Sequence, residues 1–361
     1  MDLNVLVLPG DGIGTEVTAE AVRVLRRVAD KWHHQLKLTD GLLGGVAIHK
    51  TGSPFPEETA RLAAAADATL LGAVGLPEFD AAPPEKRPEK GLLGIRKALG
   101  VYANLRPVRA YASQLDSSPL KNHLVEGTDM IIVRELTGGI YYGTPRGITE
   151  DGAETRAVNT MTYTRAEIER VSHMAFHLAR ARRKKVTSVD KSNVLENSQL
   201  WRRVVIEVAK DYPDVELDHI LVDNCAMQLI LTPRRFDVVL TENMFGDILS
   251  DEAAVLAGSI GMLPSASIGS QRPSGAWVGL YEPVHGSAPD IAGQNKANPL
   301  GAIGSAGAML LYSFGLKEEA AAVDAAIEAV LKSGRVTADL RPAGAPATTE
   351  EVGAAVCAAI G

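Results

Sequence analysis

The sequence predicts an α/β protein whose sheet is largely parallel. Short apolar segments of strand length alternate with segments whose apolar residues recur every three to four positions, and this alternation is typical of βαβ units. The composition, with 46% hydrophobic and 22% charged residues, is that of a globular protein rather than a disordered one. A length of 361 residues corresponds to about two domains.

The first elements follow from the opening residues. Residues 4–8 (NVLVL) predict a strand, and residues 9–14 predict a turn after it. A helix is expected next because apolar side chains recur at helical spacing, at Val17, Ala21, Val24, Leu25 and Val28. Thr15 is the expected N-cap of this helix.

Later elements repeat the pattern. Strands are predicted at residues 68–74, 130–133, 186–189, 217–222 and 236–241. A helix is expected to begin at Thr164, because Glu167 three residues later completes a capping box. Thr348 and Glu351 form the same pair before an Ala-rich end of the chain, which predicts helices that cover the sheet.

Composition also excludes classes of function. Lys plus Arg is 37 and Asp plus Glu is 44, and the net charge of −7 disfavours nonspecific binding to nucleic acid or anionic membranes. Cys225 and Cys357 are the two cysteines, so we expect no disulfide framework and a cytoplasmic location. No signal peptide is predicted. The low-charge stretches 253–271 and 299–316 contain proline or several glycines, which favours buried helices and loops over membrane spans.

The turn Gly10-Asp11-Gly12-Ile13-Gly14 invites comparison with the dinucleotide fingerprint. Its third glycine follows one intervening residue, where the fingerprint has two, and no acidic residue about 20 positions on ends a clear second strand. A tight turn is therefore favoured, with the fingerprint as the alternative.

Three arginines fall on or at the ends of predicted elements. Arg96 lies on a helical stretch, Arg106 is extended because it precedes Pro107, and Arg134 ends a strand. Guanidinium groups bind carboxylates in bidentate fashion, so three of them could clamp a small dicarboxylate. Ordinary surface arginines remain the alternative for each one taken singly.

Carboxylates with metal-ligand character lie further along. Asp247 and Asp251 are four residues apart on a predicted helix and share one face, and Asp223 ends the predicted strand before them. Oxygen ligands of this kind suit Mg²⁺ or Mn²⁺. An ordinary acidic helix face remains the alternative.

Other residues offer proton-transfer or binding groups. Lys191 follows a strand, where a lysine beside cationic neighbours or a metal can accept a proton, and a solvent-facing loop lysine is the alternative. Tyr141 follows a Gly-Gly turn and either donates a proton or packs. Residues 282–290 (EPVHGSAPD) are too irregular for a core strand and predict a functional loop, in which His285 could stack on a base and Asp290 could accept from ribose hydroxyls.

Together these segments identify a family. YANLRP, RELTGGIYYG, VDKSNVLE, ENMFGDILSDEAA and EPVHGSAPDIAGQNKANP resemble the β-decarboxylating dehydrogenases, and the isopropylmalate branch is the most similar. The resemblance covers essentially the whole chain. It implies a two-lobed fold on one continuous, twisted, mostly parallel sheet that is not a Rossmann fold. Residues 1–105 plus 258–361 would form a cofactor-binding lobe, and residues 106–257 a lobe with the substrate and metal site and the dimer interface.

The resemblance further implies oxidative decarboxylation of (2R,3S)-3-isopropylmalate to 4-methyl-2-oxopentanoate in leucine biosynthesis, with NAD⁺ reduced. Arg96, Arg106 and Arg134 match substrate-carboxylate ligands. Asp223, Asp247 and Asp251 match the ligands of Mg²⁺ or Mn²⁺. Lys191 matches the residue that helps remove the 2-hydroxyl proton and Tyr141 the acid that protonates C3, and Asp223 counts with both catalytic and substrate-binding residues.

Specificity is expected from apolar residues that face the variable substituent, Leu92, Leu93 and Val194. An isopropyl group fits such a patch, whereas a third carboxylate would be rejected there. An enzyme for D-malate or tartrate remains the alternative within the family, and a catalytically silent subunit the alternative outside it. The latter is disfavoured because the lysine, the tyrosine and the carboxylates are all present.

Cofactor contacts are carried over in the same way, to Glu89, His285, Gly286, Ser287, Ala288, Asp290 and Asn298. The anionic Asp290 lies where a 2′-phosphate would sit, so NAD⁺ is expected over NADP⁺. The family also implies an obligate homodimer, in which Lys191 and Asp223 reach the neighbouring subunit's site. Residues 270–276 (SQRPSGA) look longer and more polar than the usual connection before the cofactor loop.

Overall fold

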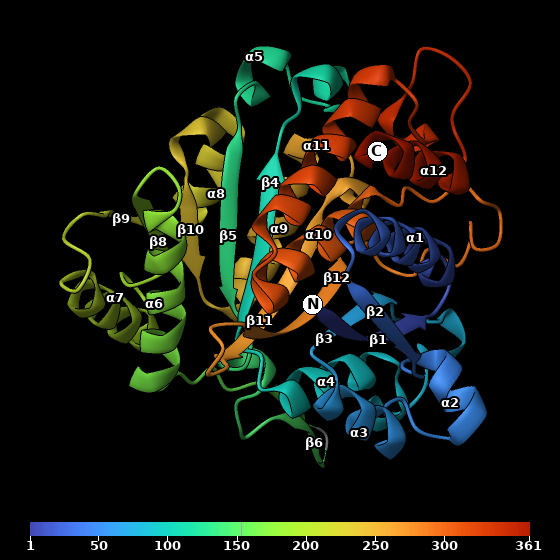
Figure 1. Ribbon diagram of the computed structural model, residues 1–361. Coiled ribbons are helices and arrows are strands. Elements are labelled where there is room, and N and C mark those ends of the chain that lie inside the picture. The colour runs from blue at the N-terminus through green and yellow to red at the C-terminus, as the bar shows by residue number, and fades with distance from the viewer. Residues whose placement is uncertain (153) are drawn as a thin grey trace. The chain divides into compact units, whose positions relative to one another are not determined.

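The computed structural model describes residues 1–152 and 154–361, which form two compact units (Figure 1). Unit 1 comprises Met1–Val101, Ala110–Asn122 and Ala257–Gly361, and unit 2 comprises Tyr102–Arg109 and His123–Leu256. These boundaries differ from the expected lobes mainly in residues 110–122, which belong to unit 1.

Side-chain hydrogen bonds to the C-terminal part of unit 1 explain this difference. Gln114 Nε2 donates to the backbone oxygen of Leu331 at 3.0 Å, and Ser117 Oγ donates to that of Leu340 at 2.7 Å. Neither contact has a local signal in the sequence, because the partners are more than 200 residues apart.

Unit 1 contains both chain ends and a mostly parallel set of strands. Their order is β2-β1-β3-β12-β11, with β11 and β12 antiparallel and the other pairs parallel. The bounds are β1 Asp2–Gly10, β2 Gln35–Asp40, β3 Ala68–Ala73, β11 Pro264–Gln271 and β12 Trp277–Pro283. Residues 272–276 form the turn between β11 and β12, where Arg272 Nη1 donates to Asp67 Oδ1 at 3.3 Å.

Helices α1, α10, α11 and α12 of unit 1 pack on one another, blue beside orange and red in Figure 1. The helices of this unit are α1 Gly14–Trp32, α2 Gly45–Thr51, α3 Glu57–Ala65, α4 Glu89–Leu99, α10 Leu300–Phe314, α11 Lys317–Ser333 and α12 Thr349–Ile360. Short 3₁₀ turns are η1 Pro77–Phe79, η2 Pro84–Lys86, η3 Ala112–Ser117, η7 Ile260–Met262 and η8 Ala338–Leu340. A core cluster under α4 includes Leu8, Leu71, Ile95 and Leu280, all fully buried.

Unit 2 repeats the architecture with strand order β4-β5-β10-β8-β9, in which β4 and β5 are antiparallel and the other pairs parallel. The strands are β4 Ala103–Arg109, β5 Asp129–Glu135, β8 Lys185–Asp190, β9 Glu216–Leu221 and β10 Val238–Thr241. The helices are α5 Asn122–Val125, α6 Arg165–Arg180, α7 Glu196–Ala209, α8 Val222–Leu231 and α9 Asn243–Ala254, with short turns η4 Gly139–Tyr141, η5 Pro233–Arg235 and η6 Val255–Ala257. Helices α6 and α7 pack against each other, as Figure 1 also shows.

A separate antiparallel hairpin, β6 (Gly147–Asp151) with β7 (Glu154–Val158), extends from unit 2 with its described side chains exposed. Two-stranded hairpins are marginal in water by themselves. Its Ile148 is 72% exposed.

The α/β class and the mostly parallel pairing are confirmed, and the order of strands in unit 1 is not that of a Rossmann fold. All six predicted strands are present, as β1, β3, β5, β8, β9 and β10. Both capping boxes are present, at the starts of α6 and α12. The prediction that Thr15 caps α1 is wrong: the helix begins at Gly14, and Thr15 Oγ1 donates to the Gly12 backbone oxygen instead.

No helix within residues 1–152 and 154–361 is long and apolar enough to cross a membrane. The stretch 299–316 is mainly the buried helix α10, as expected.

Candidate active site

Helix α9 presents two acids one turn apart, as the sequence predicted. Glu242 starts this helix by accepting from the backbone nitrogens of Phe245 at 2.7 Å and Met244 at 3.1 Å. Asp247 and Asp251 then lie on the same face, with side chains 35% and 59% exposed. Two carboxylates so close repel each other unless cations neutralise them.

Two predicted arginines supply that neutralisation within unit 2. Arg106 on β4 donates through Nη1 to Asp251 Oδ1 at 3.0 Å, and Arg134 on β5 donates through Nη1 to Asp247 Oδ1. Both arginines are buried, and their Nε atoms are held by asparagines. Asn104 Oδ1 accepts from Arg106 at 2.9 Å, and Asn243 Oδ1 accepts from Arg134 at 3.0 Å.

Tyr141 joins the same cluster from the turn η4. Its Oη donates to Asp247 Oδ2 at 2.9 Å. Partial burial, together with this carboxylate, raises the pKa of Tyr141 to about 12. The phenol therefore carries its proton at neutral pH and can donate it.

Lys191 and Asp223 form a second cluster in unit 2. Lys191 follows β8, and its Nζ lies 2.6 Å from Asp223 Oδ1. The hydrogen bond from Lys191 lowers the pKa of the Asp223 carboxyl. Asp223 does not end a strand as predicted: β9 ends at Leu221, and Asp223 lies in the first turn of α8.

The three predicted metal ligands do not come together in one chain. Among the residues that the structure describes, no group of three His, Cys, Asp or Glu side chains is placed to hold a metal ion. Asp247 and Asp251 have the chemistry of hard-cation ligands, because their donors are all oxygen and both are solvent-accessible. The donor chemistry fits Mg²⁺ or Mn²⁺ once a further carboxylate is added.

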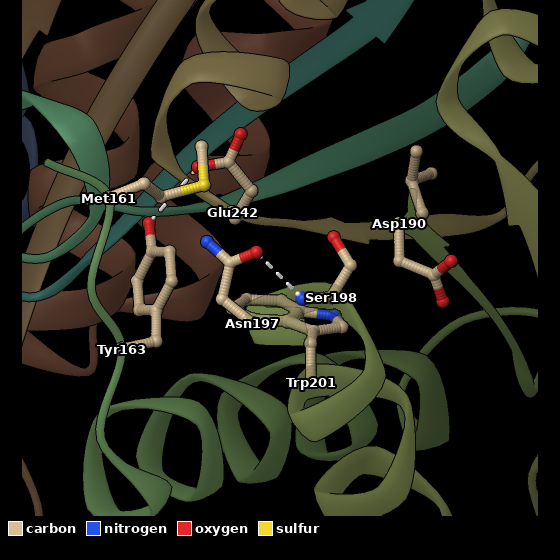
Figure 2. Close-up of a pocket in the computed structure, with 8 residues that line it drawn as sticks. Met161, Tyr163, Asp190, Asn197, Ser198, Trp201 and Glu242 are labelled. Atoms are coloured by element: carbon tan, nitrogen blue, oxygen red, sulfur yellow. Dashed lines mark hydrogen bonds between the residues drawn. The ribbon is translucent and has the colours of Figure 1, made fainter. Parts of the chain in front are cut away.

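Unit 2 also contains a small pocket (Figure 2), lined by Met161, Tyr163, Val189, Asp190, Asn197, Ser198, Trp201 and Glu242. Its empty volume is about 200 Å³, including open solvent, which is below the usual size of a ligand site. Figure 2 shows the Tyr163 hydroxyl turned toward Glu242, to which it donates at 3.2 Å. Ser198 Oγ accepts from the Lys191 backbone nitrogen at 3.1 Å, so the pocket wall supports Lys191.

In unit 1, helix α4 carries Glu89, Leu92, Leu93 and Arg96 at positions that share one helical face. Leu92 packs against the core cluster. Arg96 Nη2 donates to Glu282 Oε1 at 2.7 Å, and each side chain of this pair is 11% exposed. Within the described chain, the buried Nε of Arg96 has no hydrogen-bond partner, so it can donate to a ligand carboxylate.

The predicted cofactor loop packs on the glycine turn. Ile13 N donates to the Ser287 backbone oxygen at 2.8 Å. Gly12 has φ +54°, and a β-carbon there would lie 2.0 Å from that same oxygen, so a glycine is required. Beside this contact, a β-carbon at Gly75 would lie 3.4 Å from Glu89 Oε1 and 3.5 Å from Ser287 Oγ, which places two predicted cofactor residues together.

His285 carries an orphaned polar atom. Its Nδ1 donates to the Gly286 backbone oxygen at 2.8 Å, and burial lowers the pKa of the ring. In the neutral ring Nε2 is an acceptor, and this buried atom has no partner among the residues described. The arrangement fits a ligand with hydrogen-bond donors, as a nucleotide has.

The remaining cofactor candidates differ in exposure. Gly286 and Asp290 are exposed, and Ala288 is half-buried with φ +36°. Asn298 is buried, donates through Nδ2 to Asp339 Oδ2 at 2.9 Å and accepts at Oδ1 from Leu300 N at 3.0 Å. Asn298 therefore also fixes the start of α10. Val194 in unit 2 is 64% exposed.

Sequence reasoning missed three residues that hold predicted arginines, which are Asn104, Asn243 and Glu282, and a fourth, Asp11, that holds the backbone near the glycine turn. Asp11 is buried and accepts from the backbone nitrogens of Gly45, Val46 and Gly75 at 2.8, 2.8 and 2.9 Å. Asn104 had a signal, because two-residue alternation on a strand puts it on the same face as Arg106. Asn243 and Glu282 had none, since their partners are remote in sequence.

Residues 4–356 match the family described as isocitrate/isopropylmalate dehydrogenase.

The chain belongs to the isocitrate/isopropylmalate dehydrogenase family.

Within this family the chain is 60% identical to 3-isopropylmalate dehydrogenase of Geobacillus kaustophilus (strain HTA426), over 94% of this chain and 91% of the relative. It is 55% identical to the protein of the same name from Aquifex aeolicus (strain VF5), over 93% and 91%. Among solved structures, isocitrate dehydrogenase from Methylococcus capsulatus matches with a TM-score of 0.87 and 34% identity, over 99% of each chain. A beta-decarboxylating dehydrogenase from Thermococcus kodakarensis matches with a TM-score of 0.79 and 36% identity, over 99% and 96%.

Proposed function

We propose that this chain catalyses the NAD⁺-dependent oxidative decarboxylation of (2R,3S)-3-isopropylmalate to 4-methyl-2-oxopentanoate, a step of leucine biosynthesis. The observation that supports it most is the cluster in unit 2, where two buried arginines, two acids of α9 and a protonated tyrosine contact one another. The similar relatives that carry the name 3-isopropylmalate dehydrogenase support the choice of substrate.

In this proposal Arg96, Arg106 and Arg134 bind the two carboxylates of the substrate. Arg106 and Arg134 suit this role because burial and fixed Nε contacts leave their guanidinium groups little freedom to lose on binding. Leu93, with Leu92 beside it and Val194, is proposed to face the isopropyl group.

The chemistry needs one proton removed and one delivered. Lys191, held beside Asp223, is proposed to accept the proton of the 2-hydroxyl as C2 transfers its hydride to NAD⁺. The bond from C3 to its carboxylate then breaks and releases carbon dioxide. Tyr141 is proposed to deliver a proton to C3, since its raised pKa keeps the phenol protonated.

Asp247 and Asp251, with Asp223, are proposed to hold Mg²⁺ or Mn²⁺. When bound, the cation supplies Lewis-acid stabilisation of negative charge on the substrate oxygen at C2. Glu89, the segment from His285 to Ala288, Asp290 and Asn298 are proposed to bind NAD⁺. The exposed carboxylate of Asp290 would repel a 2′-phosphate, which favours NAD⁺ over NADP⁺.

We further propose a homodimer in which Lys191 and Asp223 serve the site of the partner subunit. Apolar side chains on α8 and α9 support this: Met227, Leu231 and Ile248 are 56%, 57% and 61% exposed. The exposed β6–β7 hairpin also suits pairing with a second copy. Free thiols at Cys225 and Cys357 are consistent with the proposed cytoplasmic location.

Mixing two inactive variants tests the shared site. Lys191→Ala and Asp247→Asn chains, unfolded and refolded together in equal amounts, should regain about a quarter of wild-type activity, because half of the dimers then contain one intact site. Each variant refolded alone is the control. Inactivity of the mixture, with mixed dimers confirmed by mass spectrometry, would refute sharing.

The substrate is tested with the purified protein. NADH formation is followed with 3-isopropylmalate, D-malate and tartrate, and kcat/KM is expected to be highest for 3-isopropylmalate. A higher kcat/KM for D-malate or tartrate would overturn the role given to the leucines. The absence of turnover with each of the three would favour a silent subunit.

A further inference from the structure

Asn243, the first residue of α9, contacts two parts of the candidate active site at once. Its side chain is 1% exposed. Oδ1 accepts from Arg134 Nε at 3.0 Å and from Nη2 at 2.8 Å, and Nδ2 donates to the Gly138 backbone oxygen at 3.0 Å. One amide therefore uses its acceptor on a substrate-binding arginine and a donor on the turn that leads to Tyr141.

The contact with Arg134 sets the direction of the guanidinium. Asn243 occupies Nε and Nη2, which form one edge of the group, and Nη1 is left for Asp247. A planar guanidinium held along one edge cannot rotate about its axis without breaking two hydrogen bonds. The two hydrogen bonds to Asn243 thus fix the direction in which Nη1 of Arg134 points.

The contact with Gly138 fixes the turn that carries Tyr141. Gly139 has φ +75°, and a β-carbon there would lie 2.5 Å from the Tyr163 hydroxyl, so the turn is closely packed. Glu135 holds the other side, because its Oε1 accepts from Thr137 N at 2.9 Å and its Oε2 from Gly138 N at 2.7 Å. Asn243 and Glu135 thus hold the backbone of this turn by hydrogen bonds from two sides.

Asn243 is itself held by the wall of the pocket in Figure 2. Its backbone nitrogen donates to Tyr163 Oη at 3.0 Å, and Tyr163 donates in turn to Glu242. Since Glu242 caps α9, one chain of hydrogen bonds joins the helix start, the pocket wall and Asn243.

We propose that Asn243 is a positioning residue that couples the orientation of Arg134 to that of Tyr141. The inference rests on the proposed function, in which Arg134 binds substrate and Tyr141 delivers a proton. Substrate binding and proton delivery would then share one support, and its loss would raise KM and lower kcat together.

Asn243→Ala tests this. It should raise KM for 3-isopropylmalate about tenfold and lower kcat about tenfold, since small displacements of reacting groups have effects of this size or larger. Asn122→Ala, which removes an exposed asparagine bonded to Asp116, is the control and should change neither. Asn243→Ser replaces the variant if the alanine protein does not fold, as judged by circular dichroism.

A double-mutant cycle separates coupling from general damage. In a Tyr141→Phe background, Asn243→Ala should lower kcat by less than about twofold, and in an Arg134→Lys background it should raise KM by less than about twofold. Full effects in both backgrounds, or no effect in the wild type, would overturn the coupling. Unchanged kinetics in Tyr141→Phe and Arg134→Lys by themselves would overturn the proposed function as well.

Discussion

The proposed substrate-binding arginines of the two units have carboxylate partners that differ in burial. Arg96 pairs with Glu282, and both side chains are 11% exposed. Arg106 and Arg134 pair with Asp251 and Asp247, which are 59% and 35% exposed and are proposed metal ligands.

The difference predicts different responses to a divalent cation. Bound at Asp247 and Asp251, the cation would compete with the arginines for those oxygens and leave Arg106 and Arg134 available to substrate. Arg96 would keep Glu282 and would offer its unpartnered Nε. Carboxylate binding by unit 2 should therefore depend on the metal, and cofactor binding by unit 1 should not.

Metal removal should have the largest effect. EDTA is expected to lower NADH formation about a thousandfold or more, because the acids of α9 then remain paired with the arginines, and Mg²⁺ or Mn²⁺ should restore it. The dissociation constant of NAD⁺, measured by calorimetry, should change by less than about threefold. Undiminished turnover in EDTA would contradict the metal site, and lost NAD⁺ binding would contradict the contrast between the units.

Lys191→Ala should lower kcat by about a hundredfold to ten-thousandfold, because no other group is proposed to accept the 2-hydroxyl proton. Lys185→Ala is a matched control: it lies at the other end of β8 and pairs with the exposed Glu216 at 2.8 Å. It should leave kcat unchanged. Equal kinetics for the two variants would remove Lys191 from the mechanism.

Glu282→Gln should destabilise the fold by about 3 kcal/mol, since it leaves the buried charge of Arg96 without a counterion. Urea unfolding measures this. Glu216→Gln breaks an exposed pair and should have little effect. If the free energy of unfolding falls equally in both variants, burial does not make the Arg96–Glu282 pair more important to stability than the exposed pair.

Asp290→Lys should have the smallest effect, confined to cofactor choice. The ratio of kcat/KM for NAD⁺ to that for NADP⁺ should fall about tenfold, because an anion that repels a 2′-phosphate becomes a cation that attracts it. Turnover at saturating NAD⁺ should not change. A larger ratio would refute the repulsion argument.

Much of this protein was already determined by local sequence. Two-residue and helical periodicities specify the strands of the sheet and the core face of α1. The capping boxes at Thr164 and Thr348 specify where α6 and α12 begin, because each box involves only residues within one turn. The placement of Asp247 and Asp251 on one face of α9 is also local, because the two residues are one helical turn apart.

Only the tertiary structure decided which side chains hold the predicted arginines in place. Arg134 meets Asn243 across 109 residues and Arg96 meets Glu282 across 186, and no periodicity links positions so far apart. The segment before Asp223 predicts a strand that ends at this residue, yet the chain turns into α8 at Val222. Local hydrogen bonds and side-chain spacing fix elements, whereas the pairing of buried charges depends on how those elements pack, and that is a property of the folded chain.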